Sequence, residues 1–125
     1  MNRKGLGNRG EETAAAYLEQ KGYAILERQY RTPVGEIDLI ARDGKTLAFI
    51  EVKTRRTARY GQPAAAVGRE KQRRITRAAM WYMMNQQRQG EAPPCRFDVV
   101  EVYATSDEGE WKVRQLESAF EAGEM

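Results

Sequence analysis

Two carboxylates and a lysine in one short segment are the side chains of this sequence best placed to do chemistry. Asp38 and Glu51 lie on either side of an Asp-Gly pair at 43–44, and Lys53 follows two residues after Glu51. Asp-Gly tolerates the positive φ of a tight turn, so the segment 35–53 is predicted to be a β-hairpin. With residues 43 and 44 as its loop, Asp38 and Glu51 become diagonal neighbours, with Cβ atoms roughly 5–8 Å apart.

Side chains alternate between the two faces of a strand, which groups the charged residues of this hairpin. One face takes the charged set Glu36, Asp38, Glu51 and Lys53, and the other takes the apolar set Leu39, Ala48, Ile50 and Val52. The nearly continuous apolar run 47–52 is typical of a central strand that is buried on both sides. Carboxylates that face each other there must take up a proton, pair with a cation or bind a metal. Two interpretations stay open: a hard divalent cation held by Asp38 and Glu51, or a solvated face with Lys53 as a surface partner.

The composition excludes several kinds of site. The chain has 125 residues, 41% hydrophobic and 31% charged, as expected of one soluble domain with a single core. It has no histidine, which excludes a histidine base, and its single Cys95 excludes a disulfide framework and a multi-cysteine zinc site. Hydrolytic chemistry would therefore depend on carboxylates, lysine and a hard metal. No apolar run could span a membrane and no signal peptide is visible, so we expect a cytoplasmic protein.

Positive charge is concentrated in the middle of the chain, although the formal net charge is only +3. From Lys53 to Arg77 the sequence has nine basic residues and a single acid, Glu70. A basic segment favours a polyanionic partner such as nucleic acid, although a solvated surface explains it equally well. The residues that would contact phosphates are Arg55, Arg56, Arg59, Lys71, Arg73 and Arg74.

Periodicity predicts the order helix, three strands, helix, two strands. The predicted helices are 10–21 and 69–89, and the predicted strands are 23–30, the two arms of the hairpin 35–53, 96–105 and 110–116. We expect a single domain over 1–125, with a flexible basic arm at 1–9 and an acidic tail at 117–125. This order fits an α/β domain with a mixed central sheet of about five strands flanked by helices.

Two helical residues could add to the hairpin site. Glu11 falls on the apolar stripe of the first helix, where it is either a partner of the helix dipole or an acid that points toward the hairpin. Lys71 lies one turn before Ile75 on the inner side of the second helix. It either snorkels along apolar surface or reaches an anion at the site. Four large side chains of the second helix are expected in the core: Met80, Trp81, Met83 and Met84.

These motifs carry a resemblance to a known family. The sequence resembles the YraN-like family of uncharacterised bacterial proteins in Gly10-Glu11, in GEIDLIA at 35–41, in AFIEVKTR at 48–55 and in Lys71. That family is similar to archaeal-type Holliday junction resolvases within the PD-(D/E)xK, restriction-endonuclease-like superfamily. The resemblance covers most of the chain and implies a restriction-endonuclease-like fold. One departure is Gln29, where relatives more often have Asn, and it leaves a detail of the turn open.

The resemblance also implies an activity and a role for each site residue. It implies an endonuclease that uses Mg²⁺ or Mn²⁺ to hydrolyse DNA phosphodiester bonds, with branched or flap structures among the substrates. The implied catalytic residues are Glu11, Asp38, Glu51 and Lys53. The implied metal ligands are Asp38, Glu51 and the backbone carbonyl of Val52, with Glu36 as a secondary candidate.

Two other classes of function stay open at this point. The chain could be a non-catalytic nucleic-acid-binding module that keeps the nuclease fold and serves a partner enzyme, or a structural protein whose hairpin carboxylates are solvated. Resolvase-like relatives cut junctions as two-fold dimers, so a homodimer is one expected assembly and a monomer is the other.

Overall fold

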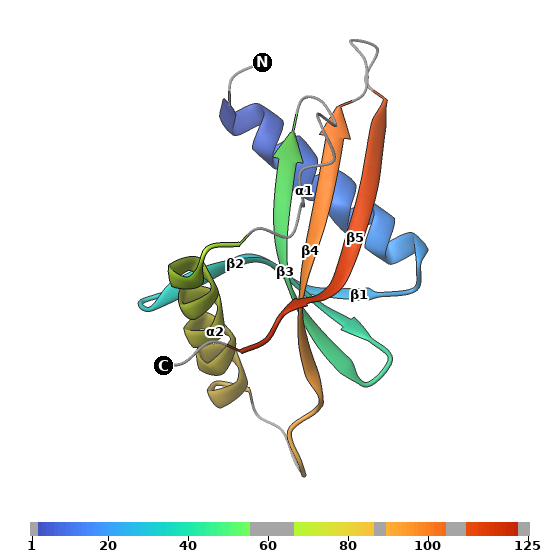
Figure 1. Ribbon diagram of the computed structural model, residues 1–125. Coiled ribbons are helices and arrows are strands. Elements are labelled where there is room, and N and C mark those ends of the chain that lie inside the picture. Colours follow the sequence, from blue (N-terminus) through green and yellow to red (C-terminus); the bar gives the residue numbers. More distant parts are fainter. Residues whose placement is uncertain (1–2, 56–66, 87–89, 105–109, 123–125) are drawn as a thin grey trace.

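The computed structural model describes residues 3–55, 67–86, 90–104 and 110–122, which form a five-stranded sheet and two helices (Figure 1). The elements in chain order are α1 (Arg3–Gln20), β1 (Ala24–Thr32), β2 (Gly35–Asp43), β3 (Thr46–Arg55), α2 (Arg69–Met84), β4 (Cys95–Ala104) and β5 (Trp111–Phe120). The predicted α/β class and the predicted order of helices and strands are both confirmed.

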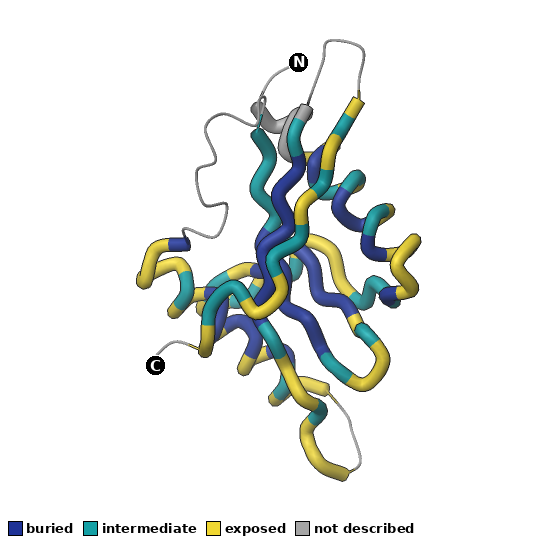
Figure 2. The backbone as a smooth tube through the Cα atoms, turned by 45° about the vertical axis from the view of Figure 1, so that its right-hand side comes forward, coloured by how far each residue is buried: buried dark blue, intermediate teal, exposed yellow. Residues whose placement is uncertain are grey.

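The sheet is mixed, because the strands follow in chain order and all neighbours are antiparallel except β3 and β4. The parallel pair requires a crossover, and α2 lies in it. β3 is the central strand, and its residues from Leu47 to Glu51 are all buried. Figure 2 shows these buried central strands between more exposed edges. The apolar run 47–52 therefore correctly predicted that this strand is the central, buried one.

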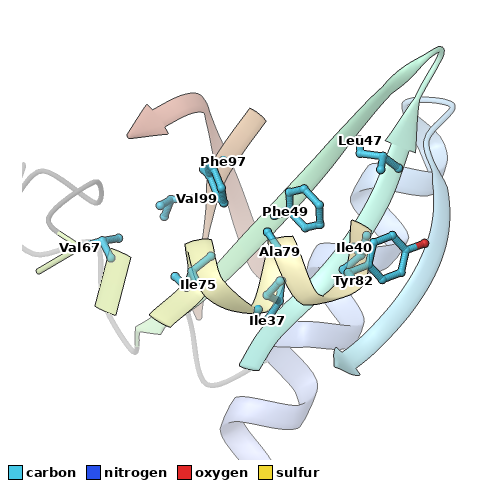
Figure 3. Packing of buried hydrophobic residues seen from close by; sticks show 11 residues of the cluster. Ile37, Ile40, Leu47, Phe49, Val67, Ile75, Ala79, Tyr82, Phe97 and Val99 are labelled. Carbon is cyan, nitrogen blue, oxygen red and sulfur yellow. The ribbon is translucent and has the colours of Figure 1, made fainter. Parts of the chain in front are cut away.

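Each helix covers a different face of the sheet (Figure 1). On the face of α2, the core includes Ile40, Phe49, Ile75 and Tyr82, and Figure 3 shows Phe49 beside Ala79 of α2. On the face of α1, the helix residues Ala14, Ala15 and Leu18 pack against a strand set that includes Leu39, Ala48 and Ile50. The predicted apolar face of the hairpin is thus confirmed as the face that α1 covers.

The hairpin turn lies one residue further along the chain than predicted. Asp43 pairs with Thr46, so the loop is Gly44-Lys45, and Gly44 alone has a positive φ, of 60°. Glycine at the first loop position is typical of a type II′ turn, whereas the prediction assumed a type I′ turn at 43–44. Moving the turn by one residue moves the register by two. The side chains therefore keep their predicted faces, but Asp38 comes opposite Glu51 instead of diagonal to it.

β2 separates from β3 at Asp38. The last pair between the two strands is Leu39 with Ile50. Ile37 belongs to the core under α2 whereas Leu39 belongs to the core under α1, although residues two apart share a face in a regular strand. β2 therefore twists strongly at Asp38. We call this separation of β2 from β3 at Asp38 and Glu51 the fork.

Several predicted boundaries and one core assignment are wrong. Residues 3–9 belong to α1 instead of a flexible arm, and residues 117–120 belong to β5 instead of a tail. The predicted end of the second helix at residue 89 lies outside the described residues, and α2 itself ends at Met84. The side chains outside the buried stripe of α2 are exposed instead of lying in the core: Met80, Trp81 and Met84. Glycines at 5, 7 and 10 suggested a flexible start, because glycine is a poor helix former, but packing on the sheet outweighs propensity.

A carboxylate pair where two strands separate

The centre of the candidate site is the carboxyl pair of Asp38 and Glu51 at the fork. Oδ2 of Asp38 accepts a hydrogen bond of 2.7 Å from the backbone N–H of Val52. The side chain thus takes the place of a strand partner where the backbone ladder between β2 and β3 stops. This contact holds the Asp38 carboxyl next to β3, one residue from Glu51.

The surroundings of Asp38 disfavour its charged form. Burial raises the pKa of its carboxyl, the charge of Glu51 raises it further, and the hydrogen bond from Val52 lowers it by less. The charge of Glu11 also raises it, and the resulting pKa is about 7 instead of 3.8. Near neutral pH, Asp38 therefore readily holds a proton or, in its place, a cation.

Lys71 of α2 contacts the other member of the pair. Its ammonium forms an ion pair with Oε1 of Glu51, whose residue is only 6% exposed. Partial burial lowers the pKa of Lys71, but the hydrogen bond and charge of Glu51 outweigh this effect and the pKa is raised. Lys71 was expected either to snorkel along apolar surface or to reach an anion at the site. The structure shows the second alternative, with Glu51 as the anion. Its single positive charge balances one of the two carboxylates.

A close backbone approach sets α2 at the distance that this ion pair needs. A Cβ on Gly35, at the start of β2, would overlap the backbone carbonyl of Arg74. Because glycine has no Cβ, β2 and α2 can approach each other there. Lys71 precedes Arg74 by about one helical turn, so this approach also brings the start of α2 over the fork.

Glu11 comes from α1, on the opposite face of the sheet from Lys71. A Cβ on the neighbouring Gly10 would overlap the side chain of Thr54 on β3, so α1 approaches β3 closely at this point. The Glu11 carboxylate accepts a hydrogen bond of 2.8 Å from Nε2 of Gln29 on β1. It lines a groove of about 570 Å³ between α1 and β1, together with Asn8, Glu12, Arg28, Gln29, Arg31 and Leu39. The Glu11 carboxylate thus bonds to β1, and its role at the hairpin site stays a prediction.

Lys53 lies two residues after Glu51 on the same strand and is half-buried. In the parallel register its partner on β4 is Glu101, which is 1% exposed and forms an ion pair of 3.5 Å with Arg55. Oε2 of Glu101 has no hydrogen-bond partner among the described residues. Sequence reasoning missed Glu101, although an acid between valines in the apolar run VVEV at 99–102 is a signal that could have found it.

The other predicted site residues lie further from the pair. Glu36 is exposed and forms an ion pair of 3.7 Å with Arg31, so it lies at the rim. Arg73 is exposed, and Arg74 forms an ion pair of 2.9 Å with Glu70. Arg56 and Arg59 lie outside the described residues.

The oxygen ligands at the fork are of the kind that a hard divalent cation prefers. Within residues 3–55, 67–86, 90–104 and 110–122, no group of three acidic or cysteine side chains is close enough to hold a metal ion. A cation at the fork would therefore have two protein carboxylates, with backbone oxygen and water as its other ligands. Mg²⁺ commonly binds in this way, through one or two carboxylates and several waters. In the described part of the chain, no helix is long and apolar enough to cross a bilayer.

Fold and site together define an α/β protein with a carboxylate pair, one member buried and one partly buried, at a fork in its sheet. The model of the uncharacterised protein family UPF0102 matches residues 10–102. A UPF0102 protein of Symbiobacterium thermophilum is 50% identical, over 98% of this chain and 100% of its own length. UPF0102 proteins of Desulfosudis oleivorans and Caldicellulosiruptor saccharolyticus are 47% and 42% identical, each over 96% of this chain and over 93% and 100% of their own lengths. The chain belongs to UPF0102, the YraN-like family that its motifs resemble.

Proposed function

We propose that this protein is a divalent-metal-dependent endonuclease that hydrolyses DNA phosphodiester bonds, with branched and flap structures as its substrate class. The observation that carries the proposal is the Asp38–Glu51 pair, with Glu51 buried and Asp38 partly buried, which Lys71 neutralises only in part. A pair of this kind costs free energy in an unliganded fold, and a bound cation offsets that cost. The resemblance of D…ExK to the PD-(D/E)xK nucleases supports the same function.

In this proposal Asp38 and Glu51 hold the cation, which is Mg²⁺ or Mn²⁺. The N–H and C=O of one strand residue point to the same side, so the carbonyl of Val52 faces the fork as its N–H does and is the proposed third ligand. When bound, such a cation lowers the pKa of a water molecule and clamps phosphate oxygens.

The remaining residues act on the phosphate and on the attacking water. Lys53 orients that water or offsets the negative charge that develops on the phosphate. Exposed basic side chains at the start of α2, such as Arg73, bind flanking phosphates and fix the position of the DNA without reading bases. Lys71 leaves Glu51 when a cation arrives and is then free to contact a phosphate. Symmetric cutting of a junction would require a two-fold dimer.

Cleavage assays test this proposal. Four-way junction, flap and single-stranded DNA are incubated with the protein and Mg²⁺ or Mn²⁺, beside the variants Asp38→Asn and Lys53→Ala. Asp43→Asn is the matched control, because Asp43 lies on the same strand at the end away from the fork. We expect cleavage by the wild type and the control and none by the two site variants. Equal cleavage by all four proteins would contradict the proposal.

A second candidate function is a non-catalytic DNA-binding module. The observation that favours it is the ion pair between Lys71 and Glu51, because an ammonium already occupies an oxygen that a metal would need. This candidate predicts DNA binding that weakens with salt and no cleavage with any metal. It also predicts that Asp38→Asn leaves DNA binding unchanged.

A further inference from the structure

Gln29 has an unusual backbone conformation for a residue inside a strand. Its φ is 48°, and among the described residues Ser118 is the other non-glycine residue with a positive φ, of 51°. The neighbouring pairs Arg28–Leu39 and Tyr30–Ile37 keep one register between β1 and β2 across it, so Gln29 is not a turn residue. A left-handed conformation costs a residue of this type free energy, and it persists only where the surroundings impose it.

The side chain of Gln29 makes a contact with α1. Its amide nitrogen donates to Oε2 of Glu11 at 2.8 Å, across the gap between β1 and α1. Both residues line the groove of about 570 Å³ between these elements. If this bond were absent, the Glu11 side chain could turn into the open groove beside it.

Gln29 is also next to the fork. In the β1–β2 register it lies between the pairs Arg28–Leu39 and Tyr30–Ile37, which places it across from Asp38. The approach of Gly10 to Thr54 fixes the backbone of Glu11 on the sheet, and the bond from Gln29 fixes its carboxylate. Gln29 therefore joins the two acids, because its side chain bonds to Glu11 and its backbone lies across from Asp38.

We propose that Gln29 is a positioning residue, which holds the Glu11 carboxylate beside the Asp38–Glu51 pair. Lys71 balances one of the three negative charges, and the other two attract a divalent cation. The left-handed backbone of Gln29 aims its amide at α1. This inference rests on the proposed function for the identity of the ligand, a hard divalent cation. It adds a residue that touches neither the metal nor the substrate.

The test compares two glycine substitutions that relieve the same backbone strain. Gln29→Gly removes strain and the bond to Glu11, whereas Ser118→Gly removes strain at a site on β5 and leaves Glu11 untouched. Mn²⁺ binding is measured by titration calorimetry, and thermal unfolding is measured in EDTA. We expect both variants to unfold at or above the wild-type temperature. We expect only Gln29→Gly to bind Mn²⁺ more weakly, by about tenfold.

A double-mutant cycle with Glu11→Gln separates positioning from a direct effect of Gln29. In the Glu11→Gln background, Gln29→Gly should weaken Mn²⁺ binding no further. Equal Mn²⁺ affinity of wild type and Gln29→Gly, absence of Mn²⁺ binding by the wild type, or additive losses in the cycle would each overturn the inference. Weaker Mn²⁺ binding by Gln29→Gly in a protein that cleaves no DNA would uphold the inference and reject the nuclease activity.

Discussion

At the scale of single residues, the central feature is a carboxyl group held where its charge is unfavourable. Asp38 is bound through its side chain to the backbone of Val52 and faces the carboxyl of Glu51. Stability and cation binding therefore compete at this residue. The ionised form that a metal would need is the form that the unliganded fold disfavours.

This competition predicts how stability depends on pH. Because the pKa of Asp38 is raised from 3.8 to about 7 on folding, the folded state binds the proton more tightly than the unfolded state. The free energy of unfolding therefore loses this contribution as the pH rises from about 4 to about 7, and no more is lost above. Asn keeps an acceptor for the N–H of Val52 but has no charge. We expect Asp38→Asn to be more stable than wild type by about 1–3 kcal/mol at pH 8, and equal to it near pH 4.

Urea unfolding in EDTA at both pH values measures this difference. The gap between wild type and Asp38→Asn should grow with pH. A gap that stays the same from pH 4 to pH 8 would show that Asp38 carries no unfavourable charge.

At the scale of helices and strands, two glycines bring both helices to the fork. Gly10 lets α1 approach β3 at Thr54, and Gly35 lets β2 approach α2 at Arg74. Gly10 directly precedes Glu11, and Gly35 directly precedes Glu36 at the rim of the site. The glycines therefore position the site as well as shape the backbone.

Gly10→Ala tests this at α1. The added Cβ would overlap the side chain of Thr54, so α1 must shift, and we expect a loss of about 1–3 kcal/mol in the free energy of unfolding. Thr54→Ala in the same chain should restore part of it. Gly68→Ala is the comparison variant, because a Cβ there meets nothing within 4 Å. Since Gly68 is the N-cap of α2, where alanine is less favourable than glycine, we expect it to lose no more than about 1 kcal/mol. A Gly10→Ala variant as stable as the comparison variant would contradict the close approach.

Alternation and periodicity predicted much of this arrangement. They predicted that Asp38 and Glu51 share a face, since a two-residue register shift leaves faces unchanged. They left open whether Lys71 reaches an anion at the site, because that depends on how α2 crosses the sheet. The bond from Gln29 to Glu11 was missed because it depends on how α1 packs beside β1 and on the positive φ of Gln29. The ion pair of Arg55 with Glu101 was missed because it joins β3 to β4, which are distant in sequence.

At the scale of the whole molecule, both faces of the sheet contribute to one site. Glu11 comes from α1, Lys71 comes from α2, and the carboxylate pair comes from the strands between them (Figure 1). The helix that brings Lys71 to Glu51 also has four exposed arginines: Arg69, Arg73, Arg74 and Arg77. DNA bound there would lie along α2.

This placement predicts binding that depends steeply on salt. With about four phosphate contacts, affinity for duplex DNA should fall about 100-fold between about 50 and about 200 mM salt. Arg73→Ala should reduce the slope of log affinity against log salt by about one unit. Lys45→Ala, in the hairpin turn away from the fork, should leave the slope unchanged. Fluorescence anisotropy in Ca²⁺ measures these slopes. Equal slopes for wild type and Arg73→Ala would show that DNA does not bind along α2.

A crystal structure with Mn²⁺, read through the anomalous signal of the metal, tests the central claim most directly. We predict an ion bound by Asp38 and Glu51, with Lys71 displaced from its contact with Glu51. An empty fork with Lys71 still on Glu51, at Mn²⁺ concentrations that saturate known metal nucleases, would contradict the account.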